Sequence, residues 1–325
     1  MAKLVATSPT LWAADGKGKD KYYEHYRLSS SQSSQDLRNW VDQAYFIDNL
    51  AQYLDKDFAK NLRDTDFYGR LWELEVVEWL RKTGLALAPT NGKGPDFCLQ
   101  LNDGNKIWVE AVLSRPDQEL KDIEQEALAS NGQLYNTPRE QTALRYSTSL
   151  VGKAKKIKAD YLTKYVSKDD YIIIAVSAFA PGAMRPDMDL FMLSILPIDH
   201  QVVYFPLNGK TLDETTPRPT HTLKTEHAKK SGALVKKEFI YPGSDFPYIN
   251  GVLFSEASNL QQLLGACSSR FDAETNTPHI FQNYSSRGLP AEFTDTFYYH
   301  KFRDNGDLVT LDCFDPKDPS SGSSN

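Results

Sequence analysis

The chain has 325 residues, enough for one large domain or two ordinary ones, and its 40% hydrophobic content suits a packed globular protein. Its 37 Lys and Arg residues against 43 Asp and Glu residues give a formal net charge of −6, which argues against a generally basic nucleic-acid-binding surface and leaves only local basic patches. Three scattered cysteines indicate neither a disulfide framework nor a cysteine zinc site, and no apolar run reaches the roughly 18 residues that a membrane span needs, so we expect a cytoplasmic protein with no membrane partner.

We expect the chain to fold as one main domain with extensions at both ends. The polar N-terminus contains SSSQSSQ, which is typical of an exposed linker. Residues 36–61 have the spacing of two short amphipathic helices, whose aromatic positions belong to the core. The predicted regions are an N-terminal polar segment and helical extension (1–60), an α/β core (61–257), C-terminal elements packed on that core (258–315) and a disordered tail (316–325).

Residues 70–84 (RLWELEVVEWLRKTG) have the pattern of an amphipathic helix, with Asp64 or Asp66 as its N-cap. A helical projection at 100° per residue places Glu73 inside the apolar arc. A buried carboxylate is costly unless it is paired or binds a cation, so Glu73 either forms a salt bridge with Arg70 or binds a metal. The projection places the remaining charged residues on the solvent side: Glu75, Glu78, Arg81 and Lys82.

Two strand-like runs, FCLQL and KIWVEAVL, flank the turn sequence NDGN. This turn fits either a two-residue turn or a three-residue loop of residues 102–104. Only the three-residue loop, with Phe97 opposite Val109, gathers the apolar residues of both strands on one face. In this register Asp96 lies opposite Glu110, with side-chain bases about 5 Å apart. Because opposed like charges are destabilising, we expect the two carboxylates to share a cation.

A helical Glu, then Pro-Asp at the start of a strand, then a Glu one hairpin later is an order that resembles the PD-(D/E)xK nuclease superfamily. The resemblance implies a restriction-endonuclease-like core in which Glu73, Asp96 and Glu110 bind Mg²⁺ (or Mn²⁺). The family's Lys, which assists the attacking water, corresponds to Val112 in this sequence. In some members of the family the basic residue lies on a neighbouring helix instead.

Residues 142–165 have the pattern of a helix that could supply such a basic residue. In the helical projection Arg145, Ser149, Lys153 and Lys156 form one polar stripe beside the apolar positions. A charged stripe of this kind is usually a solvated surface. The alternative is that Arg145 or Lys153 contacts phosphate and replaces the lysine that is absent at position 112.

The later segments predict the rest of a sheet. Residues 171–179 form a continuous apolar run, the pattern of a strand that is covered on both faces, and residues 248–257 form a second one. A hairpin, a helix and buried strands in this order predict an α/β fold with a mixed central sheet flanked by helices and with an N-terminal helical extension. The lysine-rich residues 217–239 are either a loop that follows a nucleic-acid backbone or a polar surface loop.

These patterns predict a Mg²⁺-dependent phosphodiesterase that acts on nucleic acid, with DNA expected as the substrate. Glu73, Asp96 and Glu110 would hold the metal, and Lys153 or Arg145 would stabilise the charge that develops on the phosphate. The alternative is a non-catalytic protein on the same scaffold that binds nucleic acid or a protein partner. In that case the acids would be structural, and Glu73 would pair with Arg70.

Overall fold

The computed structural model describes residues 9–12, 17–118, 120–122, 139–178, 187–199, 222–223, 226–228, 234–236, 239–255, 277–304 and 309–316. Most of the lysine-rich loop and residues 317–325 of the predicted tail lie outside this part of the chain.

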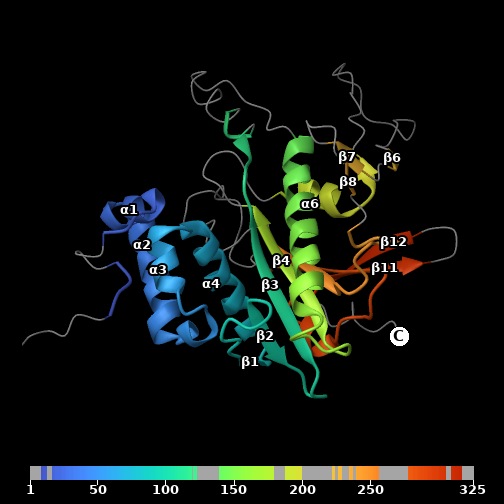
Figure 1. Ribbon diagram of the computed structural model, residues 1–325, viewed down its shortest axis with the longest axis horizontal. Coiled ribbons are helices and arrows are strands. Elements are labelled where there is room, and N and C mark those ends of the chain that lie inside the picture. Colours follow the sequence, from blue (N-terminus) through green and yellow to red (C-terminus); the bar gives the residue numbers. More distant parts are fainter. Residues whose placement is uncertain are drawn as a thin grey trace, which may run out of the picture.

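The centre of the fold is an eight-stranded mixed sheet with the order β1-β2-β3-β4-β9-β10-β11-β12 (Figure 1). Neighbouring strands are parallel at β3-β4, β4-β9 and β10-β11, and antiparallel at the other pairings. The C-terminal strands therefore extend the same sheet that the hairpin begins. The strands are β1 (Ala86–Ala88), β2 (Phe97–Gln100), β3 (Lys106–Ser114), β4 (Tyr171–Ala178), β9 (Gly251–Phe254), β10 (His279–Gln282), β11 (Tyr298–Asp304) and β12 (Val309–Phe314).

One face of the sheet is covered by the N-terminal helices, drawn in blue in Figure 1. Phe97, Val109 and Ile173 pack there, and the Trp72 Nε1 donates a hydrogen bond of 3.3 Å to the Ala175 carbonyl of β4. These helical elements are α1 (Lys21–Leu28), α2 (Gln32–Asp42), a π-helical turn (Gln43–Ile47), a 3₁₀ turn (Leu50–Tyr53), α3 (Phe58–Asp64) and α4 (Phe67–Lys82).

The opposite face carries a second apolar core under α6 (Arg139–Lys156) and α7 (Met188–Ile195). Trp108 and Ile174 point into this core, whereas their neighbours on the same strands point into the first one, as the two-residue period of a strand requires. The predicted α/β class with helices on both faces of a mixed sheet is confirmed. The described residues also form a π-helical turn (Ile157–Tyr161), a short helix α9 (Ala291–Thr294) and two small two-stranded antiparallel sheets, β5 (Ile198–Asp199) with β6 (Thr222–Leu223) and β7 (Glu226–Ala228) with β8 (Leu234–Lys236).

The register predicted for the hairpin is confirmed. Phe97 pairs with Val109, and the Leu101 amide donates a hydrogen bond of 2.9 Å to the Asn105 carbonyl, which closes a three-residue loop. Gly104 has a φ of 88°, the left-handed conformation that this loop needs and that glycine adopts without strain.

Two predictions about the N-terminal half are wrong. The serine-rich segment is not a linker, because Ser31 caps α2 by accepting a hydrogen bond from the Ser34 amide, a position that serine favours. Glu75 is not on the solvent side but is completely buried. The helical projection allowed α4 only one covered face, whereas the sheet covers one side and the N-terminal helices cover another. Trp40 of α2, for example, donates a hydrogen bond to Glu78.

No helix in the described part of the chain is long and apolar enough to cross a membrane.

Candidate functional site

Glu73 lies in the middle of α4, whose start is set by Asp66. The Asp66 side chain accepts a hydrogen bond of 2.9 Å from the Gly69 amide, so Asp66 is the N-cap, one of the two that the sequence predicted. The Glu73 carboxylate lies 2.7 Å from the Arg70 Nη1, and its side chain is 12% exposed. Burial raises the pKa of Glu73 to about 8; the charge of Asp96 adds to the rise and Arg70 opposes it.

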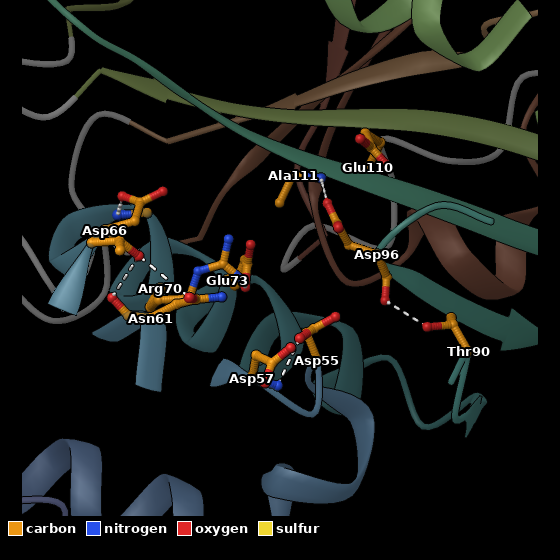
Figure 2. A network of polar contacts seen from close by, with 12 residues as sticks. Asp55, Asp57, Asn61, Asp66, Arg70, Glu73, Thr90, Asp96, Glu110 and Ala111 are labelled. Carbon is orange, nitrogen blue, oxygen red and sulfur yellow. Dashed lines mark hydrogen bonds and ion pairs between the residues drawn. The ribbon is translucent and has the colours of Figure 1, made fainter. Parts of the chain in front are cut away.

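Asp96 directly precedes β2 and lies between Glu73 and Glu110 (Figure 2). Its Oδ2 accepts a hydrogen bond of 2.8 Å from the Ala111 amide across the hairpin, which fixes the orientation of the carboxylate. Burial raises the pKa of Asp96 to about 6, the charge of Glu110 adds to the rise, and Lys153 and the Ala111 hydrogen bond oppose it. Asp96 is thus within electrostatic reach of both other acids.

Glu110 projects from β3 on the α6 side of the sheet and is completely buried. Its Oε1 accepts hydrogen bonds from the Lys153 Nζ at 2.7 Å and from the Lys156 Nζ at 3.1 Å. Its Oε2 is buried and has no hydrogen-bond partner among the described residues. A buried carboxylate oxygen without a donor is costly, so this atom is an unsatisfied polar group of the site.

A pocket of about 170 Å³ opens beside these acids. Glu73 and Asp96 reach it from α4 and from the strand start, so two of the three predicted ligands share one cavity. Asp55 is a further acid on its wall, which sequence reasoning did not single out. The other lining residues are Leu54, Thr90, Gly92, Gly94, Pro95, Phe97 and Tyr161.

The structure brings the three predicted acids into neighbouring positions, with Asp96 in the middle, but two of them already have cationic partners. Arg70 pairs with Glu73, and the α6 lysines pair with Glu110. Across the described ranges, no group of three or more His, Cys, Asp or Glu side chains is arranged so that it could hold a metal ion. The donor set is nevertheless that of a hard divalent cation: carboxylate oxygens only, with raised pKa values at two of them and an orphaned oxygen on the third.

The two basic residues predicted on α6, Lys153 and Arg145, lie in different places. Lys153 contacts Glu110, next to the place where the family pattern would have its lysine, while Val112 itself packs into the core under α6. Arg145 lies elsewhere, because its Nε donates a hydrogen bond of 2.8 Å to the Arg115 carbonyl and its Nη1 is 3.7 Å from Asp117.

Lys156 is a partner of Glu110 that sequence reasoning did not assign to the site. The sequence did indicate that Lys156 could reach the site, because it is three residues after Lys153 and lies on the same side of the helix.

Comparisons of the chain with protein-family models, with curated proteins and with solved structures found no match.

Proposed function

We propose that this protein is a Mg²⁺-dependent phosphodiesterase that cleaves nucleic acid, with DNA as its preferred substrate, and that its sheet is a restriction-endonuclease-like core. The observation that carries the proposal is the Asp96–Glu110 pair at a hairpin, flanked by Lys153 on one side and by a pocket with Glu73 on the other. Carboxylates next to an ammonium group, beside an open pocket, are groups with which metal-dependent hydrolysis of a phosphodiester can be carried out.

The three acids have separate roles in this proposal. Asp96 is oriented by the Ala111 amide, and Glu110 has a free Oε2, so these two carboxylates would hold Mg²⁺ (or Mn²⁺). Glu73 would join them after it separates from Arg70. A divalent cation held by these carboxylates would lower the pKa of a nearby water molecule and would neutralise charge on the scissile phosphate.

Lys153 is the basic residue that we assign to the reaction. Its side chain is 26% exposed, and its ammonium group contacts Glu110. A fixed positive charge in this position stabilises the negative charge that develops on the phosphate. We give Arg145 no role in catalysis, because its guanidinium is held by the Arg115 carbonyl and by Asp117.

The decisive test is a cleavage assay with Mg²⁺ and with Mn²⁺ on single-stranded and double-stranded DNA and RNA. We expect Asp96→Asn and Glu110→Gln to abolish cutting. Glu78→Gln is the matched control, because Glu78 is a half-buried acid of α4 outside the pocket and a glutamine oxygen can still accept the Trp40 hydrogen bond. Cutting by both site variants at the rate of the control would remove this site from consideration.

One observation favours a second function, a non-catalytic protein that binds nucleic acid. Arg70 and Lys153 already neutralise two of the three acids, as they would in a scaffold that needs no metal. In that case none of the nucleic acids is cleaved by the wild-type protein, and neither cation changes its stability.

A further inference from the structure

A strongly basic segment covers the last turn of α6 and the residues that follow it. Residues 153–168 (KAKKIKADYLTKYVSK) contain six lysines and a single acid, Asp160, in a chain whose net charge is −6. Apart from Lys153, these lysines are exposed: Lys155, Lys156, Lys158, Lys164 and Lys168. A local excess of positive charge on an acidic protein indicates a surface that attracts polyanions.

Two tyrosines in the same segment border the acidic pocket. Tyr161 ends the π-helical turn that follows α6 and lines the pocket itself. Tyr165 is 41% exposed and lies one turn further on, where its amide donates a hydrogen bond of 2.9 Å to the Tyr161 carbonyl. The two ring centroids are 6.3 Å apart.

Gly94 brings Tyr165 to the rim of the pocket. Gly94 is a lining residue, and a Cβ atom built on it would be 3.3 Å from the Tyr165 Cβ and 3.2 Å from the Trp108 ring. A side chain at this position would have to push the tyrosine or the Trp108 ring away by a few tenths of an ångström. The Tyr165 side chain is therefore held against a residue of the pocket wall.

Lys156 contacts both an acid of the site and one of the two tyrosines. Its Nζ is 3.1 Å from the Glu110 Oε1 and lies 5.0 Å from the centre of the Tyr161 ring. One ammonium group thus contacts a carboxylate of the site and an aromatic ring at the pocket wall. Any polyanion that contacts Lys156 is brought to both.

We propose that the basic segment 153–168 binds single-stranded nucleic acid at the mouth of the pocket, with phosphates on the lysines and unpaired bases on Tyr161 and Tyr165. Aromatic side chains stack on bases of any sequence, but in a duplex the base faces are already stacked. An exposed tyrosine beside a lysine-rich segment thus favours a single strand. The inference rests on the proposed function, because it names the form of nucleic acid that reaches the acids.

The test measures binding without cleavage. Fluorescence anisotropy in EDTA compares a labelled 20-nucleotide single strand with its duplex. We expect the single strand to bind more tightly, and we expect Tyr165→Ala to weaken its binding by roughly 5- to 100-fold, the range for loss of one stacked base. Tyr165→Phe keeps the ring and should bind as the wild type does, and Tyr165→Ala should leave duplex binding unchanged.

The lysines are tested by salt dependence. Each phosphate contact that is lost reduces the slope of log affinity against log salt concentration by about 0.7 for a single strand. We expect this reduction for Lys158→Ala and for Lys164→Ala, and no change for Lys60→Ala, an exposed lysine of α3. Circular dichroism of each variant establishes that it is folded.

Equal affinity for single strand and duplex, or unchanged single-strand binding by Tyr165→Ala, would overturn the inference. Its failure can be distinguished from failure of the proposed function. If Asp96→Asn abolishes cutting while Tyr165→Ala binds normally, only the present inference is wrong. If Tyr165→Ala loses single-strand binding but the wild-type protein cuts nothing, the enzymatic proposal is wrong and the binding surface stands.

Discussion

Glu110 is the most constrained residue of the site, because it is completely buried and satisfies one of its oxygens with two lysines of α6. Such a carboxylate depends on its partners, since a buried charge that loses its counter-ion cannot recover the hydration that folding removed. Lys153 is the closer of the two lysines and the less exposed.

We therefore expect Lys153→Met to lower the free energy of unfolding by about 1–3 kcal/mol, less than for a wholly buried pair because Lys153 is partly exposed and Lys156 remains. Urea denaturation measures the change. Lys155→Met is the matched control, an exposed lysine on the same helix, and it should change stability by less than about 0.5 kcal/mol. Similar values for the two variants would show that the Glu110 pair contributes little.

His279 and His300 form a second titratable pair, far along the chain from the acids. The His279 Nδ1 is 2.8 Å from the His300 Nε2, and the His300 ring stacks on Phe281. Burial lowers the pKa of His279 to about 4 and that of His300 to about 3, where the charge of His279 adds to the effect.

In the unfolded chain these histidines titrate near 6.5. Between that value and the lowered pKa the unfolded state binds more protons, so the pair's contribution is complete above pH 6.5 and is lost as the pH falls. We expect the free energy of unfolding of the wild type to fall more steeply than that of His300→Phe between pH 6.5 and 4, by up to about 1.4 kcal/mol per pH unit for each proton. Parallel denaturation curves for the two proteins over this range would contradict this explanation.

At the scale of the elements, the hairpin of β2 and β3 fixes the site, because its three-residue loop decides which residue lies opposite Asp96. The alternating pattern predicted this register, since a shift of one residue would have moved polar groups into the core. The loop requires the left-handed conformation at Gly104, where a Cβ atom would meet no other atom within 4 Å. A substitution there tests the backbone alone.

We expect Gly104→Ala to destabilise the protein by about 1–2 kcal/mol, the cost of a left-handed backbone for a residue with a Cβ atom. Gly152→Ala provides the opposite control. Gly152 lies in α6 and also has open space around its Cβ position, so alanine there should stabilise the protein by about 0.5–1 kcal/mol. Thermal denaturation of both variants shows whether each substitution raises or lowers the stability of the protein. Destabilisation by both would show that the loop conformation at Gly104 is not the cause of the loss.

Contacts between elements that are distant in the chain were harder to predict than the elements. The projection of α4 found Glu73 but placed Glu75 in solvent, because a helical period does not tell which second layer covers the helix. The stripe on α6 included both Lys153 and Arg145, and only the packing of the helix on the sheet decides that Lys153 reaches Glu110 whereas Arg145 contacts the Arg115 carbonyl. Tyr161 carried no signal in the sequence, because its place at the pocket depends on a π-helical turn.

At the scale of the whole molecule, metal binding would be linked to stability, since the acids come from α4, from the loop before β2 and from β3. A ligand that binds only the folded state stabilises it by about 2.7 kcal/mol at 100 times its dissociation constant. We expect Mg²⁺ or Mn²⁺ to raise the melting temperature of the wild type by several degrees relative to EDTA. The double variant Asp96→Asn/Glu110→Gln should show no such shift, and an unchanged wild-type melting temperature would favour the non-catalytic function.

Strand β4 has buried side chains on both faces of the sheet. Tyr171, Ile173 and Ala175 belong to the layer of the N-terminal helices, and Ile172, Ile174 and Val176 to the layer of α6. The strand thus separates the two apolar cores. Inserting or deleting one residue in it would move the side chains that follow from each core into the other. Because β3 is paired with β4 from Ile107 to Ser114, the acids of the hairpin keep their positions only while both cores are packed correctly.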